Sequence, residues 1–339
     1  MRLKPQKRLF IGVDIGGTKV AAGIVNRGGK IVASTRARMV ARGSAEEGFQ
    51  AVVEGIDGLM RDRRAKNAAT IGISVPGWVD PARGTLVGAA NIPCWRNFPL
   101  ARRVEKRYGL RTLIANDANV AALAEATWGA GKKYRNVFYV TLGTGIGTGI
   151  VLDGRIYDGR TGAAGEGGHT TIDFRGPVCG CGKRGCIEAY ASGTAIARRA
   201  QERLAEIGTG ESAMVARANG KIDGVTCEIV SEAAEQGDPL AIEALNEAAE
   251  RLGVWLGNII ELLEPDVIVM GGGVGHLMMS YAGTIRESLE IWAINPRWRE
   301  IPIVEAKYGP ESAMVGAAAL GLARAEAAGS TKRKSRRRV

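Results

Sequence analysis

The sequence is poor in aromatic residues and has no long apolar run. Phe, Trp and Tyr make up 5% of the 339 residues, and no segment approaches the ~18 consecutive apolar residues that cross a membrane. The N-terminus lacks the apolar core of a secretory signal peptide, because a strand-like segment begins at Leu9 directly after a short basic stretch. These absences predict a cytoplasmic protein that makes no use of a membrane.

Glycine, by contrast, is abundant. The 48 glycines are about twice the usual share of roughly 7%, and they gather in short bursts after strand-like segments. Glycine at such places lets the backbone approach a ligand closely. The apolar content of 45%, rich in Ala, Val and Ile, suits parallel strands covered by helices. The length of the chain fits two domains.

The net charge of +11 is concentrated at the two ends of the chain. Residues 331–339 carry six positive charges and residues 2–8 carry four, which leaves +1 for the rest. Terminal charge runs are usually solvated and disordered. This distribution argues against a specific nucleic-acid partner and leaves weak binding of polyanions open.

Strand and helix patterns alternate along the chain, as in an α/β protein. The expected strands are 9–14, 19–26, 31–38, 70–75, 113–115, 137–142, 149–152 and 267–270. Helices are expected at 45–64, 118–127 and 313–327, and they dominate 193–263.

A strand, a glycine turn and a second strand occur at 9–25 and again at 137–152. This internal repeat suggests a duplicated nucleotide-binding architecture with a cleft between two halves. We expect a first lobe over 1–115 and a second over 116–312. The last helix, 313–327, is expected to pack back on the first lobe, and 328–339 to form a disordered basic tail.

The first glycine burst is Asp14-Ile15-Gly16-Gly17-Thr18-Lys19. Its adjacent glycines free backbone N–H groups to face phosphate oxygens. Thr18 adds a hydroxyl donor, Lys19 adds a cation, and Asp14 at the strand end is placed to reach a phosphate-bound Mg²⁺. The ATP-binding residues predicted here are Asp14, Gly16, Gly17, Thr18 and Lys19.

Two further glycine bursts follow the strands at 137–142 and 267–270. In the first loop, Thr18 precedes Lys19, which is the reverse of the lysine–hydroxyl order of a Walker loop. In the second loop, Gly143-x-Gly145 is followed by Thr148 at the position where a dinucleotide fingerprint needs glycine. The loop at 14–19 and the loop at 141–149 both lead into a strand and not into a helix. This excludes a nicotinamide site and predicts phosphate binding. A plain glycine-rich hairpin is the alternative for either loop alone. The ATP-binding residues predicted from these bursts are Thr141, Gly143, Thr144, Gly145, Gly147, Gly271, Gly272 and Gly273.

The most specific local signal is a cluster of one histidine and three cysteines. Cys179, Cys181 and Cys186 lie within eight residues, with glycines between them, and His169 precedes them. Together they supply the four nitrogen and sulfur ligands of a closed tetrahedral zinc site. A closed site has no open coordination position, so one structural Zn²⁺ is expected. Chance clustering and a redox pair are the alternatives.

Asn116 and Asp117 follow a short strand at the expected lobe boundary. A carboxylate there can accept the proton of an attacking hydroxyl while Asn116 fixes the substrate. The alternative is that both residues only cap the following helix. Glu166 and Glu188 flank the zinc cluster and can accept hydrogen bonds from sugar hydroxyls. Paired carboxylates also occur in glycosidases, but phosphate loops have no use in hydrolysis.

The remaining reactive side chains are expected to have no role in the chemistry. Cys94 and Cys227 are expected to be packed thiols, and His276 to lie on the surface or in a loop. Glu105 and Glu125 fall in charged helical patterns and are expected to be solvated.

Taken together, these motifs resemble the ROK family of sugar kinases and regulators. The resemblance covers roughly residues 9–325 and includes Ser74–Gly77 and Asn91-Ile92-Pro93 besides the motifs above. It implies a two-lobed actin-like ATPase (ribonuclease H-like) fold whose lobes close over the substrates. It also implies that the protein forms a homodimer and uses ATP with Mg²⁺.

By this resemblance, Asp117 is the catalytic base. The sugar would be held by Asn116, Glu166, His169 and Glu188, and bordered by Gly77 and Asn91. His169 would then act both as zinc ligand and as sugar contact.

The segment from Gly84 to Asn97 looks most like the glucokinase branch, which makes glucose the first expected substrate and glucose 6-phosphate the product. Cys94 and Trp78 depart from that branch near the sugar pocket.

Other readings follow from the same motifs. Mannose, fructose or an N-acetylhexosamine could replace glucose, and polyphosphate could replace ATP. A sugar-responsive repressor has the same core, but only eight residues precede the first expected strand, which is too few for a helix-turn-helix.

Overall fold

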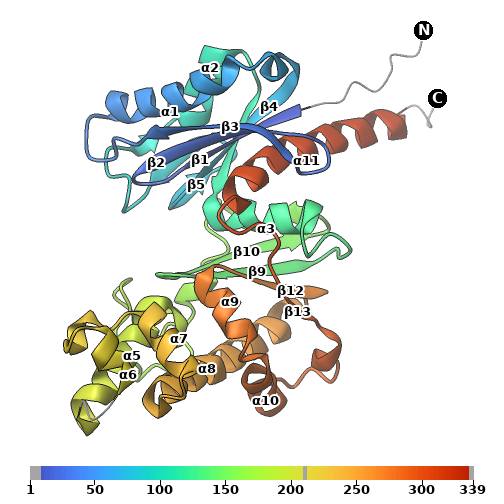
Figure 1. The fold of residues 1–339 in the computed structure, drawn as a ribbon. Helices are drawn as coiled ribbons and strands as arrows, with labels where there is room; N and C mark the ends of the chain where they lie inside the picture. The colour runs from blue at the N-terminus through green and yellow to red at the C-terminus, as the bar shows by residue number, and fades with distance from the viewer. Residues whose placement is uncertain (1–8, 209–211, 336–339) are drawn as a thin grey trace. The chain divides into compact units, whose positions relative to one another are not determined.

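The computed structural model describes residues 9–208 and 212–335. Its contacts divide the chain into two units (Figure 1). Unit 1 comprises residues 1–137, 149–165 and 307–339, and unit 2 comprises 138–148 and 166–306. Among the described helices, none combines the length and the apolar character that a membrane crossing requires.

Unit 1 is built on a five-stranded sheet with the order β3-β2-β1-β4-β8. The strands are β1 (Leu9–Ile15), β2 (Lys19–Val25), β3 (Ile31–Arg38), β4 (Ala68–Val75) and β8 (Thr112–Asn116). The first three form antiparallel hairpins, whereas β4 runs parallel to both β1 and β8. The carboxyl ends of β1, β4 and β8 therefore meet at one edge of the sheet.

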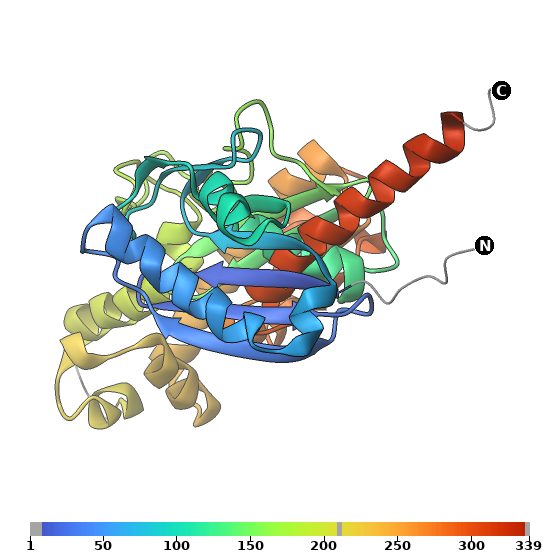
Figure 2. The ribbon, with the colours of Figure 1, turned by 90° about the horizontal axis from the view of Figure 1, so that it is seen from above.

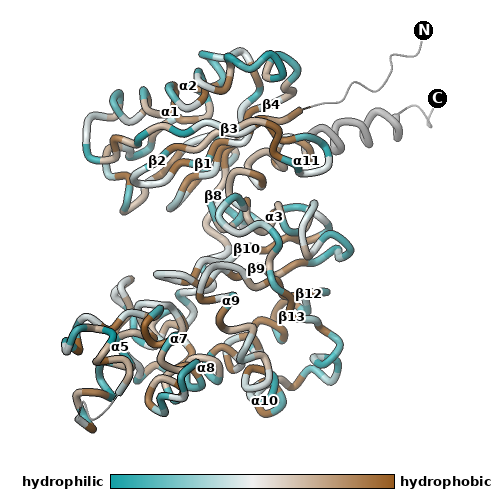
Figure 3. The backbone as a smooth tube through the Cα atoms, viewed as in Figure 1, coloured by the Kyte–Doolittle hydropathy of each residue, from teal (hydrophilic) through white to brown (hydrophobic). Residues whose placement is uncertain are grey.

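Helices cover both faces of this sheet (Figures 1 and 2). On one face lies α1 (Ala45–Met60), which begins with a capping box between Ser44 and Glu47 and buries Phe49, Val52 and Ile56. On the other lies α11 (Ser312–Ser335). A Cβ at Gly72 of β4 would lie 1.7 Å from the carbonyl oxygen of Ala317, so glycine is what allows this helix to approach. The apolar strands between the two helices show as brown segments in Figure 3.

Unit 1 also contains elements that the sequence patterns did not indicate. A small antiparallel sheet consists of β5 (Trp78–Asp80), β6 (Thr85–Gly88) and β7 (Arg96–Phe98). It is followed by α2 (Leu100–Tyr108), and η1 (Arg63–Asn67) precedes β4. The helix α3 (Asp117–Trp128) continues directly from β8.

The second five-stranded sheet has the order β11-β10-β9-β12-β13. Its strands are β9 (Val137–Leu142), β10 (Ile146–Leu152), β11 (Arg155–Ile156), β12 (Val267–Gly271) and β13 (Ile303–Glu305). The helices of unit 2 are η2 (Gly167–His169), α4 (Glu188–Ala191), α5 (Gly193–Ile207), α6 (Ala213–Arg217), η3 (Ile222–Gly224), α7 (Cys227–Glu235), α8 (Pro239–Leu263), α9 (Gly273–Met279), α10 (Ala282–Trp292) and η4 (Trp298–Glu300).

The expected strands are all present, and the strand expected at 149–152 already begins at Ile146. The division of the chain differs from the expected one. The boundary expected at 115/116 falls before the last residue of β8. Both β8 and the following helix α3 belong to unit 1, because α3 packs against α11. The tail expected to be disordered from 328 also differs, since α11 continues to Ser335, while 336–339 lie outside the described residues.

Glu125 was expected to be solvated, and this expectation is wrong. Its side chain on α3 is fully buried. Oε1 accepts hydrogen bonds from the backbone N–H groups of Lys307 and Tyr308 at 2.9 and 2.8 Å, and Oε2 accepts one from Ala130 at 2.8 Å. The carboxylate thus fixes the segment that leads into α11. Glu105 is half-buried, and its Oε2 accepts from the N–H of Thr112 at 3.1 Å.

Candidate active site

In unit 1, the predicted residues gather at the carboxyl edge of the parallel strands. Asp14 of β1 pairs with Ser74 of β4, and Val75 of β4 pairs with Asn116 of β8. The Ser74 hydroxyl donates to Asp14 Oδ1 at 3.1 Å. Burial raises the pKa of the Asp14 carboxyl, and the negative charge of Asp117 raises it further, while the bond from Ser74 and the charge of Lys19 oppose this.

Asn116 is the N-cap of α3 and also anchors the neighbouring loop. Its Oδ1 accepts from the N–H groups of Ala118 and Asn119 at 2.9 and 3.3 Å, and its Nδ2 donates to the carbonyl oxygen of Gly77 at 3.1 Å. The capping role weighed from the sequence is therefore confirmed. Asn116 also donates a side-chain hydrogen bond to Asp117.

Asp117 is the first residue of α3. Burial raises its pKa, although hydrogen bonds from the backbone and from Asn116 act in the opposite direction. A carboxylate with a raised pKa is a better proton acceptor than an ordinary one, and the first turn of a helix is a favourable place for its negative charge.

The loop between β1 and β2 is closed by a hydrogen bond from the Gly16 N–H to the Lys19 carbonyl at 2.9 Å. A Cβ at Gly17 would lie 2.8 Å from the carbonyl oxygen of Asn91, so the loop and the predicted sugar-bordering residue are in contact. Thr18 and Lys19 are exposed. Gly77 has a φ of +83°, and a Cβ there would lie 2.3 Å from the carbonyl oxygen of Gly88. Asp14, Gly17, Asn91, Gly77, Asn116 and Asp117 thus lie within one neighbourhood of unit 1.

In unit 2, the second glycine loop is a tight turn between β9 and β10. The Gly143 N–H donates to the Gly145 carbonyl at 3.0 Å, and the Gly193 N–H donates to the Gly143 carbonyl at 2.7 Å. A Cβ at Gly145 would lie 2.6 Å from Glu188 Oε2. This oxygen accepts from the Ile146 N–H at 2.9 Å. Glu188 therefore holds the end of the loop.

The four predicted zinc ligands come together, and their ligand atoms all lie within 4.8 Å of one another. Two of these separations are 3.7 Å, namely Cys179 Sγ to His169 Nδ1 and Cys181 Sγ to Cys186 Sγ. Ligands about 2.3 Å from a tetrahedral Zn²⁺ lie about 3.8 Å apart, so both the spacing and the donor set fit the ion. Burial raises the pKa of the Cys179 thiol to about 12.

Glu188 also reaches this cluster. Its Oε1 lies 3.5 Å from Cys179 Sγ and 3.7 Å from His169 Nδ1. Glu166 directly precedes η2, and its backbone carbonyl accepts a hydrogen bond from the His169 N–H at 3.1 Å. Glu166 is exposed. The structure thus brings His169 and Glu188 together at the predicted metal site, and Glu166 is linked to His169 through the backbone.

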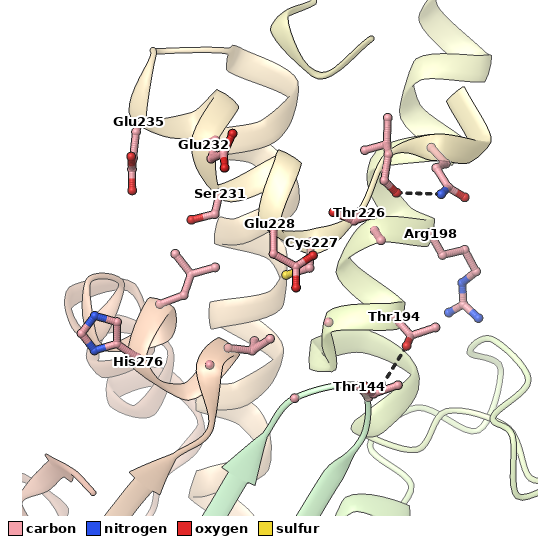
Figure 4. A pocket seen from close by; sticks show the side chains of 18 of the residues that line it. Thr144, Thr194, Arg198, Thr226, Cys227, Glu228, Ser231, Glu232, Glu235 and His276 are labelled. Carbon is pink, nitrogen blue, oxygen red and sulfur yellow. Dashed lines mark hydrogen bonds between the residues drawn. The ribbon is translucent and has the colours of Figure 1, made fainter. Parts of the chain in front are cut away.

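A cavity of about 900 Å³ lies beside the glycine loop in unit 2 (Figure 4). It is lined by Gly143, Thr144 and Gly273 of the predicted set, and Thr194 Oγ1 donates to the Thr144 carbonyl at 2.9 Å. Gly271, in contrast, is buried at the end of β12, where a Cβ would lie 2.7 Å from the Tyr139 hydroxyl. The volume suits a nucleoside-sized ligand.

The walls of this cavity come from α5, α7 and α9 and were missed in the sequence. They are Gly193, Thr194, Ala197, Arg198, Gln201, Val225, Thr226, Cys227, Glu228, Ser231, Glu232, Glu235, Val274, His276, Leu277 and Ser280. Ordinary helix residues carry no motif, so local patterns give no signal for them.

Cys227 and His276 both line the cavity. Cys227 is buried, which raises its pKa to about 11 and keeps the thiol neutral. His276 is exposed as expected but lies on α9 rather than in a loop, with Nδ1 2.6 Å from Glu305 Oε1.

Comparison with known proteins gives a consistent result over nearly the whole chain. The model of the ROK family matches residues 10–324. A glucokinase of Streptomyces coelicolor is 36% identical over 313 residues, which are 92% of this chain and 97% of the relative.

A solved ROK family glucokinase from Streptomyces griseus, in complex with glucose and AMPPNP, is 37% identical. It superposes with a TM-score of 0.75 over 92% of this chain and 98% of its own. A xylose repressor of Caldicellulosiruptor bescii is also similar, with 28% identity over 92% of this chain and 77% of the relative.

Proposed function

Because this chain belongs to the ROK family, we propose that it is a hexose kinase that transfers the γ-phosphoryl group of ATP to glucose. The proposal follows the similarity to glucokinases over almost their full length, one of them solved with glucose and an ATP analogue. The fold is the two-lobed actin-like ATPase fold of these relatives.

The observation that carries the proposal is the position of Asp117. It stands at the carboxyl edge of the sheet, next to the anchored Asn116 and near enough to Asp14 to raise its pKa. Phosphoryl transfer needs positioning, charge stabilisation and one acceptor for the hydroxyl proton. Asp117 has the raised pKa of such an acceptor.

We assign separate tasks to the other residues. Asp117 accepts the proton of the sugar hydroxyl, and Asn116, which is bonded to Gly77 and Asp117, positions that sugar. Asp14 supplies the hard oxygen ligand that Mg²⁺ prefers; the ion, when bound with ATP, neutralises charge on the transferred group. The glycine N–H groups of the two hairpin loops face the phosphates, and the cavity beside Gly143 holds the adenosine.

The zinc site has a structural task. Four protein ligands leave no position for water or substrate, so no step of the transfer uses the metal. His169 uses Nδ1 toward the cluster, which leaves Nε2 for a sugar hydroxyl. The ion would thus order the segment that carries both Glu166 and His169.

For the sugar substrate, other hexoses are candidates besides glucose. Trp78 follows Gly77 directly and is 60% exposed, so a large aromatic surface stands beside the sugar-bordering loop. This observation favours a test of mannose, fructose and N-acetylhexosamines beside glucose. A panel of these sugars, assayed for ADP release with ATP as donor, should give the highest kcat/KM for glucose. A higher value for another sugar would replace glucose by that sugar, and no turnover of any hexose would refute the kinase.

A further inference from the structure

Lys183 closes the turn that carries the predicted zinc ligands Cys179 and Cys181. The Cys179 N–H donates to the Lys183 carbonyl at 2.8 Å, and the Gly182 N–H donates to the Cys179 carbonyl at 2.9 Å. Gly182 has a φ of +87°, a conformation that a residue without a Cβ adopts readily. The backbone of Lys183 is therefore fixed directly beside the ligand cluster.

The side chain of Lys183 reaches the other segment of the zinc site. Its Nζ donates to the backbone carbonyl of His169 at 2.6 Å, although the two residues are 14 positions apart in the chain. Hydrogen bonds from a charged donor are shorter and stronger than those between neutral groups. The backbone N–H of Lys183 also donates to Cys181 Sγ. One residue thus contacts three of the four predicted ligands, His169, Cys179 and Cys181.

A second donor to the same carbonyl is lost when a metal binds. In the structure, Cys186 Sγ also donates to the His169 carbonyl, at 3.4 Å. Ligation of Zn²⁺ removes the thiol proton, so the thiolate cannot donate, and its negative charge then lies close to a carbonyl oxygen. The ammonium group of Lys183 still donates to that oxygen, and its positive charge offsets the repulsion.

The loaded cluster as a whole also favours a cation nearby. Three thiolates and a neutral histidine around one Zn²⁺ leave a negative charge uncompensated, and Glu188 Oε1 lies 3.5 Å from Cys179 Sγ. Opposite charges at this range attract each other. Groups that contact metal ligands from behind typically change metal affinity by about 10–100-fold. Lys183 has both the contact and the charge for this task.

We propose that Lys183 is a positioning residue that couples the predicted zinc site to the sugar site. Its ammonium group holds the backbone of His169, and with it the imidazole whose Nδ1 faces the cluster and whose Nε2 is assigned to a sugar hydroxyl. Loss of this group weakens zinc binding and displaces Nε2 from the sugar. The effect on the sugar rests on the proposed kinase function, whereas the effect on zinc does not.

The test compares the wild-type chain with Lys183→Met, which removes the charge and the donor but keeps an unbranched side chain. Lys183→Arg restores the charge. Lys221→Met is the matched control, because Lys221 is also exposed in unit 2 and its side chain has no hydrogen bond or ion pair among the described residues. Should Lys183→Met not fold, Lys183→Gln takes its place, since it is polar but uncharged.

Two quantities are measured on the full chain. Zinc affinity is obtained by competition with a chromophoric chelator, and KM and kcat are obtained for glucose at saturating ATP and zinc. We expect Lys183→Met to bind zinc about 10–100-fold more weakly than wild type. We expect its KM for glucose to rise about fivefold or more with kcat nearly unchanged, because His169 binds the sugar and takes no part in the proton transfer. Lys183→Arg and Lys221→Met should keep both quantities near the wild-type values.

Three results would overturn the proposal. The first is a Lys183→Met chain that binds zinc as tightly as Lys221→Met. The second is a Lys183→Arg chain as impaired as Lys183→Met, since the positive charge would then be irrelevant. The third is a loss of zinc affinity with an unchanged KM, since Lys183 would then serve the metal alone. Failure of the kinase proposal is distinguishable, because it removes turnover by the wild-type chain but leaves the differences in zinc affinity.

Discussion

Glu125→Gln tests whether a single buried carboxylate fixes the segment before α11. The substitution keeps the size of the side chain but replaces one carboxylate oxygen by an amide NH₂. In the structure, three backbone N–H groups point at the two oxygens, two at Oε1 and one at Oε2. The amide nitrogen cannot accept the third bond, so the N–H of Ala130 loses its acceptor.

The expected cost follows from these bonds. One buried donor without an acceptor costs roughly 1–3 kcal/mol, and the two remaining bonds weaken because the acceptor is no longer charged. We therefore expect the free energy of unfolding to fall by about 3 kcal/mol. Urea unfolding followed by circular dichroism measures this change, which appears as a lower midpoint with an unchanged slope.

A control and a second readout make the test specific. Glu54→Gln removes the same charge from an exposed position of α1 and should change the free energy of unfolding by less than about 0.5 kcal/mol. The Glu125 variant should keep its kcat at low temperature, since Glu125 touches none of the predicted substrate residues. If Glu125→Gln proves as stable as Glu54→Gln, the buried bonds do not stabilise the fold as inferred.

Three further outcomes are expected. Asp117→Ala should lower kcat about 10²–10⁴-fold with the fold intact, and a near-normal kcat would remove Asp117 from the mechanism. Because the pKa of Asp117 is raised by burial, kcat/KM should fall with decreasing pH through a pKa above the usual 3.8, and this acidic limb should be absent from Asp117→Asn. Metal analysis should find about one zinc per chain; Cys186→Ser should lose the zinc and lower the unfolding temperature, whereas Cys94→Ser should keep it.

Much of the site could be predicted from the sequence because its signals are local. A glycine loop between two strands, an asparagine before a helix and four ligands over residues 169–186 each depend on neighbours in the chain. The structure brings the four ligand atoms within 4.8 Å of one another and makes Asn116 the N-cap of α3.

The features that were missed depend on distant parts of the chain. Glu125 binds residues 307 and 308, and its own neighbourhood on α3 gives no sign of this. The cavity walls come from three separate helices, α5, α7 and α9.

Glu188 shows how the predicted zinc and the predicted sugar site depend on each other. Its Oε2 is committed to the Ile146 N–H, and its Oε1 accepts from the thiol of Cys179 at 3.5 Å. Metal ligation requires that thiol to lose its proton, and a thiolate cannot donate to Oε1. The lone pairs of Oε1 then become available to a sugar hydroxyl. Loading of the predicted zinc would therefore free Glu188 Oε1 for the proposed sugar, while the bond from the Ile146 N–H to Oε2 holds the glycine loop between β9 and β10.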